Sequence, residues 1–234
     1  MDLKFEKKIW RKRYEIVVGI DEAGRGPLAG PVFAGAVCII QKSKILPAGM
    51  AGQGENQNKD LGFKGLLRKV KDSKQLSSKQ REKIYEELTK SPFIVWAEGR
   101  AGPSVIDRIN ILQATKLAMK RAAQGLIKKL VEDGPLPTLF LVIDGNFPLN
   151  LDIPQKSIIR GDQKVFSIAV ASIIAKVRRD RLMIKYAKRF PQYGFEKHKG
   201  YPTRLHKNMA AKHGLCEIHR KSFNLGLPKS KLLC

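Results

Sequence analysis

The sequence contains few cysteines. Three occur among 234 residues, Cys38, Cys216 and Cys234, and they lie far apart. An odd number of cysteines at such wide spacing suggests neither a disulfide framework nor a zinc knuckle. We therefore expect a protein that works in a reducing compartment, the cytoplasm.

Long apolar runs are also missing. The longest, residues 165–177, is interrupted by Ser167 and Ser172, whereas a membrane-spanning helix needs about 20 apolar residues. The first ten residues, MDLKFEKKIW, contain no apolar stretch that resembles a signal peptide. A membrane-embedded or secreted protein is therefore not expected.

Acidic residues are scarce relative to basic ones. The chain has 21 Asp and Glu against 45 Lys and Arg, which gives a formal net charge of +24. Such a surface attracts polyanions, because binding releases the counterions that phosphates hold. The basic residues are dense between 176 and 221, where Tyr193, Phe195 and Tyr201 are interleaved with them, a mixture typical of nucleic-acid contacts. Composition alone leaves two classes open, an enzyme acting on nucleic acid and a non-catalytic RNA-binding protein.

The order of the apolar segments predicts an α/β fold in one domain, 1–234. Short β-branched runs predict strands, and apolar residues at helical spacing predict helices. A capping box, Ser77 with Gln80, predicts the start of a further helix. The expected strands are 16–20, 32–40, 93–98, 139–143 and 157–159, and the expected helices are 77–91, 109–130 and 165–189. Residues 41–70 are expected to form a loop insertion, and residues 190–234 a basic, helical C-terminal part.

Four acidic residues follow the predicted strands: Asp21, Glu22, Asp144 and Asp162. Strand ends can converge on one crevice of an α/β sheet, where ligands bind. Carboxylates that meet there repel one another unless a cation joins them, and Mg²⁺ is the hard cation that such oxygens prefer. An isolated acid before a glycine, such as Asp144, is more often a cap or a turn residue, so the prediction depends on the whole set.

The pair Asp21-Glu22 runs directly into a glycine-rich turn, Gly24-Arg25-Gly26. Glycines let backbone N–H groups come close to a ligand, and the spacing matches neither a Walker loop nor a dinucleotide fingerprint. Asp180 lies about 22 Å along the predicted helix from its start and is flanked by arginines, so we expect it to be an ion-pair partner. A zinc site built from His198, His206, His213, Cys216 and His219 does not fit the spacing of zinc ligands.

Several motifs together resemble the ribonuclease HII family. They occur in the family's order and extend over most of the chain, from about residue 16 to 223: VVGIDEAGRGPLAGPV (17–32), KDSKQL (71–76), NILQATKLAM (110–119), IDG (143–145), GDQK (161–164), ASIIAKVRRDR (171–181) and PQYGFEKHKGYPT (191–203).

This resemblance implies an RNase H-like fold, with a mixed central sheet flanked by helices and a helical C-terminal part. It implies that Asp21, Glu22, Asp144 and Asp162 are catalytic acids that bind Mg²⁺ or Mn²⁺, with two ions expected. Gly24, Arg25 and Gly26 match the motif that senses the ribose 2′-hydroxyl, and Tyr201 matches the tyrosine that packs on a sugar at an RNA–DNA junction. Lys74 and Lys199 correspond by position to phosphate ligands.

The expected activity is hydrolysis of the RNA strand of RNA–DNA hybrids, and of DNA duplexes at embedded ribonucleotides, leaving 5′-phosphate and 3′-hydroxyl ends. Primer removal or ribonucleotide excision repair would use it, and a monomer is expected. Two alternatives stay open. A non-catalytic RNA-binding protein would need no metal, and a junction resolvase on the same scaffold would have no use for ribose recognition by the glycine turn and Tyr201.

Overall fold

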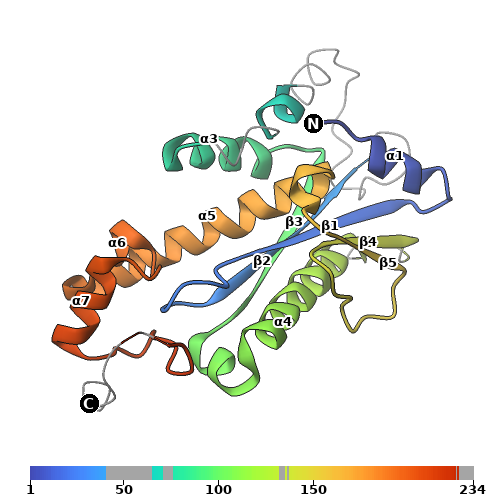
Figure 1. Ribbon diagram of the computed structural model, residues 1–234. Helices are drawn as coiled ribbons and strands as arrows, with labels where there is room; N and C mark the ends of the chain where they lie inside the picture. The colour runs from blue at the N-terminus through green and yellow to red at the C-terminus, as the bar shows by residue number, and fades with distance from the viewer. Residues whose placement is uncertain (41–64, 71–75, 132–134, 136, 225, 227–234) are drawn as a thin grey trace.

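The computed structural model describes residues 1–40, 65–70, 76–131, 135, 137–224 and 226 (Figure 1). Its strands form one sheet in the order β3-β2-β1-β4-β5. The central strand β1 is antiparallel to β2 and parallel to β4, so the sheet is mixed. The strands are β1 (Ile16–Ala23), β2 (Val32–Ile39), β3 (Ile94–Ala101), β4 (Leu139–Asp144) and β5 (Gln155–Ile158). The predicted mixed α/β fold is confirmed.

Two long helices cover opposite faces of the sheet. Helix α4 (Pro103–Val131) packs in one apolar cluster with β1, β2 and β4, and α5 (Phe166–Arg189) packs in another with β2 and α3. Figure 1 shows α5 crossing the sheet from the side of the N-terminus to the C-terminal helices. Glycines let α5 lie close, because a Cβ on Gly19 would be 2.3 Å from Ser167 and one on Gly35 would be 2.4 Å from the Ala171 carbonyl. This close approach brings the middle of α5 beside the end of β1.

The helix start predicted from a capping box agrees with the structure. Ser77 and Gln80 form the predicted capping box, and α3 (Ser78–Thr89) begins directly after it. In α4 the backbone leaves helical geometry at Asn110 (φ 64°), whose side-chain oxygen accepts hydrogen bonds from the N–H groups of Leu112 and Gln113. Helix α4 therefore consists of a short helical segment, a break at Asn110 and a long helical segment. The break lies one residue after the predicted start at Ile109.

The basic N-terminal segment forms helix α1 (Lys4–Trp10), which the sequence did not predict. Its Glu6 side chain is fully buried and accepts a hydrogen bond of 2.8 Å from the backbone N–H of Ser167, in the first turn of α5. A carboxylate is favourable there, since the first N–H groups of a helix have no partner within it. Burial nevertheless raises the pKa of Glu6.

The C-terminal part contains helices, as predicted, although residues 214–224 are not helical. It contains a short 3₁₀ helix, Pro191–Tyr193, and a short α-helix, α6 (Phe195–His198). Helix α7 (Arg204–His213) follows. Residues 227–234 of the predicted part lie outside the described residues.

The predicted loop insertion needs one correction. Residues 41–64 lie outside the described residues, but residues 65–70 are helical. Leu66 and Val70 are buried one helical turn apart against the α5 side of the sheet, so the loop does not extend to residue 70. In the parts of the chain that the structure describes, no helix combines the length and apolar character needed to cross a membrane.

Candidate active site

Strand register places two of the predicted acids side by side. Ile20 of β1 pairs with Ile143 of the parallel strand β4, so the next residues, Asp21 and Asp144, are neighbours across the two strands. One detail of the prediction is wrong, because Asp21 and Glu22 do not follow the strand. They lie within β1 and pair with Gly35 and Ala34 of β2.

Three of the four predicted acids form a carboxylate cluster. Asp21, Glu22 and Asp144 each offer an oxygen, and these oxygens lie within 4.8 Å of one another. Asp162 is not one of this group. It lies in the 3₁₀ turn Gly161–Gln163, whose first N–H donates a 2.6 Å hydrogen bond to Asp144. Asp162 is therefore adjacent in sequence to Gly161, which contacts the cluster, but its own carboxylate is not a member of the cluster.

The charges of the cluster are poorly compensated by the protein. Burial raises the pKa of Asp21 well above its ordinary value, and the carboxylates of Glu22 and Asp144 raise it further. Burial also raises the pKa of Glu22, against the opposing effect of Arg25, whose guanidinium is 3.4 Å from Glu22 Oε1. The other oxygen, Glu22 Oε2, is buried without a hydrogen-bond partner.

These features fit a divalent cation. A buried carboxylate oxygen without a partner carries a desolvation cost, and repulsion among three acids adds to it. A hard cation that accepts oxygen ligands removes both costs. The residues present are therefore suited to hold Mg²⁺ or Mn²⁺.

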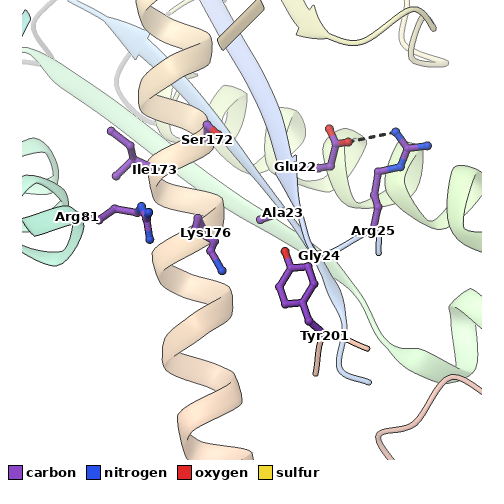
Figure 2. Close-up of a pocket in the computed structure, with 9 residues that line it drawn as sticks. All are labelled: Glu22, Ala23, Gly24, Arg25, Arg81, Ser172, Ile173, Lys176 and Tyr201. Atoms are coloured by element: carbon purple, nitrogen blue, oxygen red, sulfur yellow. Dashed lines mark hydrogen bonds and ion pairs between the residues drawn. The ribbon is translucent and has the colours of Figure 1, made fainter. Parts of the chain in front are cut away.

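Glu22, one of the three clustered acids, lines a cleft of about 370 Å³. Figure 2 shows its walls, with the glycine turn on one side, α5 and α3 on the other, and Tyr201 between them. Tyr201 is 39% exposed, and its ring centroid is 5.5 Å from the ammonium of Lys176. The lining residues are Glu22, Ala23, Gly24, Arg25, Arg81, Ser172, Ile173, Lys176 and Tyr201.

The two glycines of the turn have different roles. Gly24 has φ +98°, a conformation that L side chains rarely adopt, and a Cβ there would be 2.1 Å from Arg179 Nε. At Gly26 an added Cβ would meet nothing within 4 Å. Gly24 is thus required by the protein's own packing, whereas Gly26 leaves open space that a ligand can approach.

Two predicted lysine contacts are not settled by the structure. Lys74 lies outside the described residues. Lys199 has left-handed backbone geometry (φ 50°), and its ammonium donates to the carbonyl of Glu196. It is not among the residues that line the cleft, so its role as a phosphate ligand stays a prediction.

Asp180 is an ion-pair partner, as predicted, but with a lysine. Its carboxylate is 2.7 Å from Lys176, one helical turn earlier. The neighbouring arginines are engaged elsewhere, Arg178 with Glu98 and Arg181 with Glu82.

The histidines do not assemble a metal site. His198 and His206 stack with ring centroids 4.4 Å apart, and Nε2 of His206 lies 3.1 Å from Nε2 of His219. Burial lowers the pKa of His206 and of His219 to about 4. Over the described ranges, the carboxylate cluster is the one group of three or more His, Cys, Asp or Glu close enough to share an ion.

Sequence reasoning missed several residues of the cleft. Ser172, Lys176 and Arg81 line it, and two buried arginines, Arg179 and Arg220, lie behind the glycine turn. The helical spacing of Ser172 and Lys176, four residues apart, is a signal that they share a face. All but one of the hydrogen bonds of the two buried arginines go to residues more than 140 positions away in the sequence. No local pattern therefore marks these arginines.

Known proteins similar to this chain agree on one family. The family profile "Ribonuclease HII" matches residues 57–225, so the match does not depend on the acid pair and glycine turn at 21–26. A ribonuclease HII from Pelodictyon phaeoclathratiforme is 44% identical over 222 residues, which cover 94% of this chain and 95% of that protein.

Solved structures show the same fold. The ribonuclease H2 of Pyrococcus horikoshii OT3 superposes with a TM-score of 0.61 at 24% identity, covering 90% of this chain and 94% of that one. A structure of Bst-RNase HIII in complex with Mn²⁺ gives a TM-score of 0.62 at 18% identity, covering 84% and 61%. On the sequence profile and the full-length relatives together, this chain belongs to the ribonuclease HII family.

Proposed function

We propose that the chain cuts the RNA strand of RNA–DNA hybrids and also cuts DNA duplexes at single embedded ribonucleotides. Membership of the ribonuclease HII family makes it a ribonuclease H, a metal-dependent endonuclease that acts on nucleic acid. The finer substrate range is supported by one observation. Glu22, the acid of the cluster that has an unpartnered oxygen, lines the same cleft as Gly24, Arg25 and Tyr201.

The proposed metal ligands are Asp21, Glu22, Asp144 and Asp162, which would hold two Mg²⁺ or Mn²⁺ ions. Three of them already share a cluster, and the related Bst-RNase HIII was solved with Mn²⁺. When bound, such ions supply Lewis-acid activation of water and charge for the leaving oxygen, giving 5′-phosphate and 3′-hydroxyl products.

The remaining roles belong to the walls of the cleft. Gly24, Arg25 and Gly26 bring backbone groups next to the acid pair, where they can meet the ribose 2′-hydroxyl. Tyr201 presents a partly exposed ring for the neighbouring sugar. Lys176, with Lys74 and Lys199 as further candidates, would hold backbone phosphates. We propose a monomer, since each of these groups comes from a single chain.

Cleavage of a defined duplex tests the proposal. Wild-type protein is incubated with four substrates: a DNA duplex that carries one ribonucleotide, an all-DNA duplex of the same sequence, an RNA–DNA hybrid and an all-DNA four-way junction. Each substrate is tested with Mg²⁺, with Mn²⁺ and with a chelator. We expect metal-dependent cutting of the two ribose-containing substrates alone. Binding without cutting would identify a non-catalytic RNA-binding protein, and cutting of an all-DNA four-way junction would identify a resolvase.

A further inference from the structure

Two arginine side chains are completely buried behind the glycine turn. Arg179, in the middle of α5, and Arg220, near the C-terminus, are each 0% exposed. Arginine is rarely buried without a carboxylate partner. Here the guanidinium groups of both residues donate hydrogen bonds to backbone carbonyls, and across the described ranges no ion pair joins either group to an acid.

Arg220 fixes the direction of the peptide groups in the turn. Its guanidinium donates hydrogen bonds of 2.6 Å to the carbonyl of Gly24, 2.8 Å to that of Arg25 and 2.9 Å to that of Gly30. The described chain has no cis peptide bond, and in a trans peptide the N–H points opposite to the C=O. The N–H groups of Arg25 and Gly26 therefore point away from the buried guanidinium. Beside them, a Cβ added to Gly26 would meet nothing within 4 Å.

Arg179 joins the same turn to the segment that carries Tyr201. It donates to the carbonyls of Ala29 and Pro31, each at 3.1 Å, and to that of Lys199 at 3.0 Å. Its guanidinium carbon lies 5.8 Å from the ring centroid of Tyr201, within the range of a cation–π contact. Gly24 packs directly on its side chain. One side chain thus contacts both Gly24 of the turn and the segment that carries Tyr201.

Stability alone does not explain this arrangement. Burial lowers the pKa of both arginines, that of Arg220 to about 9, with the nearby Arg179 charge lowering it further. Well-packed apolar side chains often stabilise such sites as well as buried charges do. A guanidinium offers something that they lack, a rigid planar fork of donors that holds several carbonyls in fixed directions.

We propose that Arg179 and Arg220 are positioning residues for ribose recognition, which hold the amide groups of the glycine turn and the ring of Tyr201 at the spacing that a ribonucleotide junction needs. This inference rests on the proposed function of the cleft. The arginines touch neither the carboxylate cluster nor the open side of the turn, so their effect is on geometry and not on metal binding.

Conservative variants test it. Arg179→Lys and Arg220→Lys keep the charge but lose the planar fork, and Arg189→Lys is a matched control, since Arg189 forms an exposed ion pair with Glu217 in the same basic region. For each protein we would measure kcat and KM on the single-ribonucleotide duplex, Kd for the all-DNA duplex, Mn²⁺ affinity and Tm. Rates are normalised to the folded fraction, counted by Mn²⁺ binding.

We expect kcat on the single ribonucleotide to fall by at least about 10-fold in both test variants, because a displacement of about 1 Å in a reacting geometry can cost about 100-fold. Kd for the all-DNA duplex and Mn²⁺ affinity should stay within about twofold of the wild type, and Arg189→Lys should match the wild type throughout. A normalised kcat that equals the wild-type value in both variants would overturn the proposal and leave the two arginines as structural residues.

A measurement on the wild type covers the case in which the variants do not fold. With metal chelated, the ¹⁵Nε resonances of Arg179 and Arg220 should shift more on binding the ribonucleotide duplex than on binding the all-DNA duplex. Identical shifts would contradict the inference. If wild-type protein with metal does not cut the ribonucleotide at all, it is the proposed function that fails, so the two failures are distinguishable.

Discussion

The carboxylate cluster and the glycine turn face the same cleft, yet the protein holds them in opposite ways. Asp21, Glu22 and Asp144 are fixed by strand register, and their charges repel with one buried oxygen left unpartnered. In the turn, in contrast, the carbonyls of Gly24 and Arg25 accept hydrogen bonds from the guanidinium group of Arg220, and the side chain of Arg179 packs against Gly24. The charges of the cluster need a bound cation to balance them, whereas hydrogen bonds within the protein already hold the backbone of the turn.

This difference separates two tasks within one cleft. Any phosphodiester can meet the metal ligands, because RNA and DNA present the same phosphate. Recognition of the 2′-hydroxyl needs donors and acceptors placed in advance, and we propose that the glycine turn supplies them. Variants on the two sides should therefore fail in different ways.

The largest effect is expected on the cluster side. Asp144→Asn removes one charge but keeps an oxygen that can still accept from Gly161 N–H. Turnover should fall by about 1,000-fold or more, since a metal ligand contributes several kcal/mol to the transition state, while duplex affinity stays close to that of the wild type. Single-turnover cleavage and a binding titration measure the two quantities. Near-normal cleavage would remove Asp144 from the metal site, and Asp162→Asn provides the same test for the acid that lies at the cluster's edge.

A smaller and more selective loss is expected at Tyr201. Tyr201→Ala removes the ring beside Lys176 and Arg179 and should reduce cleavage at a single embedded ribonucleotide by about 10- to 100-fold, a loss of about 1.4–2.7 kcal/mol. A continuous RNA strand should be cut with a smaller loss, since its neighbouring sugars carry hydroxyls. The ratio of kcat/KM on the two substrates is the readout. Equal losses would make Tyr201 a general packing residue.

Acid should destabilise the segment that carries Tyr201, because the buried His206 is hydrogen-bonded to the carbonyl of Tyr201. The folded-state pKa of His206 and of His219 is about 4, below the ordinary value of 6.5, so the unfolded chain binds more protons between these pH values. Their contribution to stability is therefore present above pH 6.5 and is lost as the pH falls towards 4. Over this window we expect Tm to drop by at least about 4 °C, which is about 1–2 kcal/mol at this chain length.

Thermal unfolding at a series of pH values measures this slope. His206→Gln, which can still bond the carbonyl of Tyr201 and the ring of His219, should have a shallower dependence. A slope identical to that of the wild type would show that other groups control acid stability.

The smallest effect is expected at Asp180. Its ion pair with Lys176 lies on one helix and is partly exposed, and such pairs contribute about 0.3–0.5 kcal/mol. Asp180→Asn should therefore lower Tm by no more than about 2 °C and keep most of the wild-type rate of the chemical step. A variant with wild-type melting behaviour and no activity would instead place Asp180 in the catalytic machinery.

Much of the fold followed from local patterns in the sequence. The capping box at Ser77 and the helical spacing between 109 and 130 predicted elements that the structure contains. The end of β1 could not be located in this way, because Asp21 and Glu22 interrupt the apolar run while pairing with β2 keeps them extended. Helix α1 was missed for a similar reason, since its burial depends on Glu6 reaching Ser167.

Some residues of the candidate site could likewise be proposed from the sequence, and others could not. The acids and glycines were recognisable because their chemistry is specific and their motif is compact. Arg179 and Arg220 were not, because an arginine in a basic stretch looks like a solvated charge until the chain folds. Their roles depend on contacts with Ala29 and Gly24, 150 and 196 residues away.

That separation has a consequence for synthesis. A chain leaving the ribosome presents its acid pair early, and β4 completes the carboxylate cluster with Asp144. Arg220, which orients the turn, emerges 196 residues after Gly24. An unfinished chain therefore contains the proposed metal ligands before it contains the arginine that we propose to position the turn. If the proposal holds, ribose selectivity depends on one of the last segments of the chain to be synthesised.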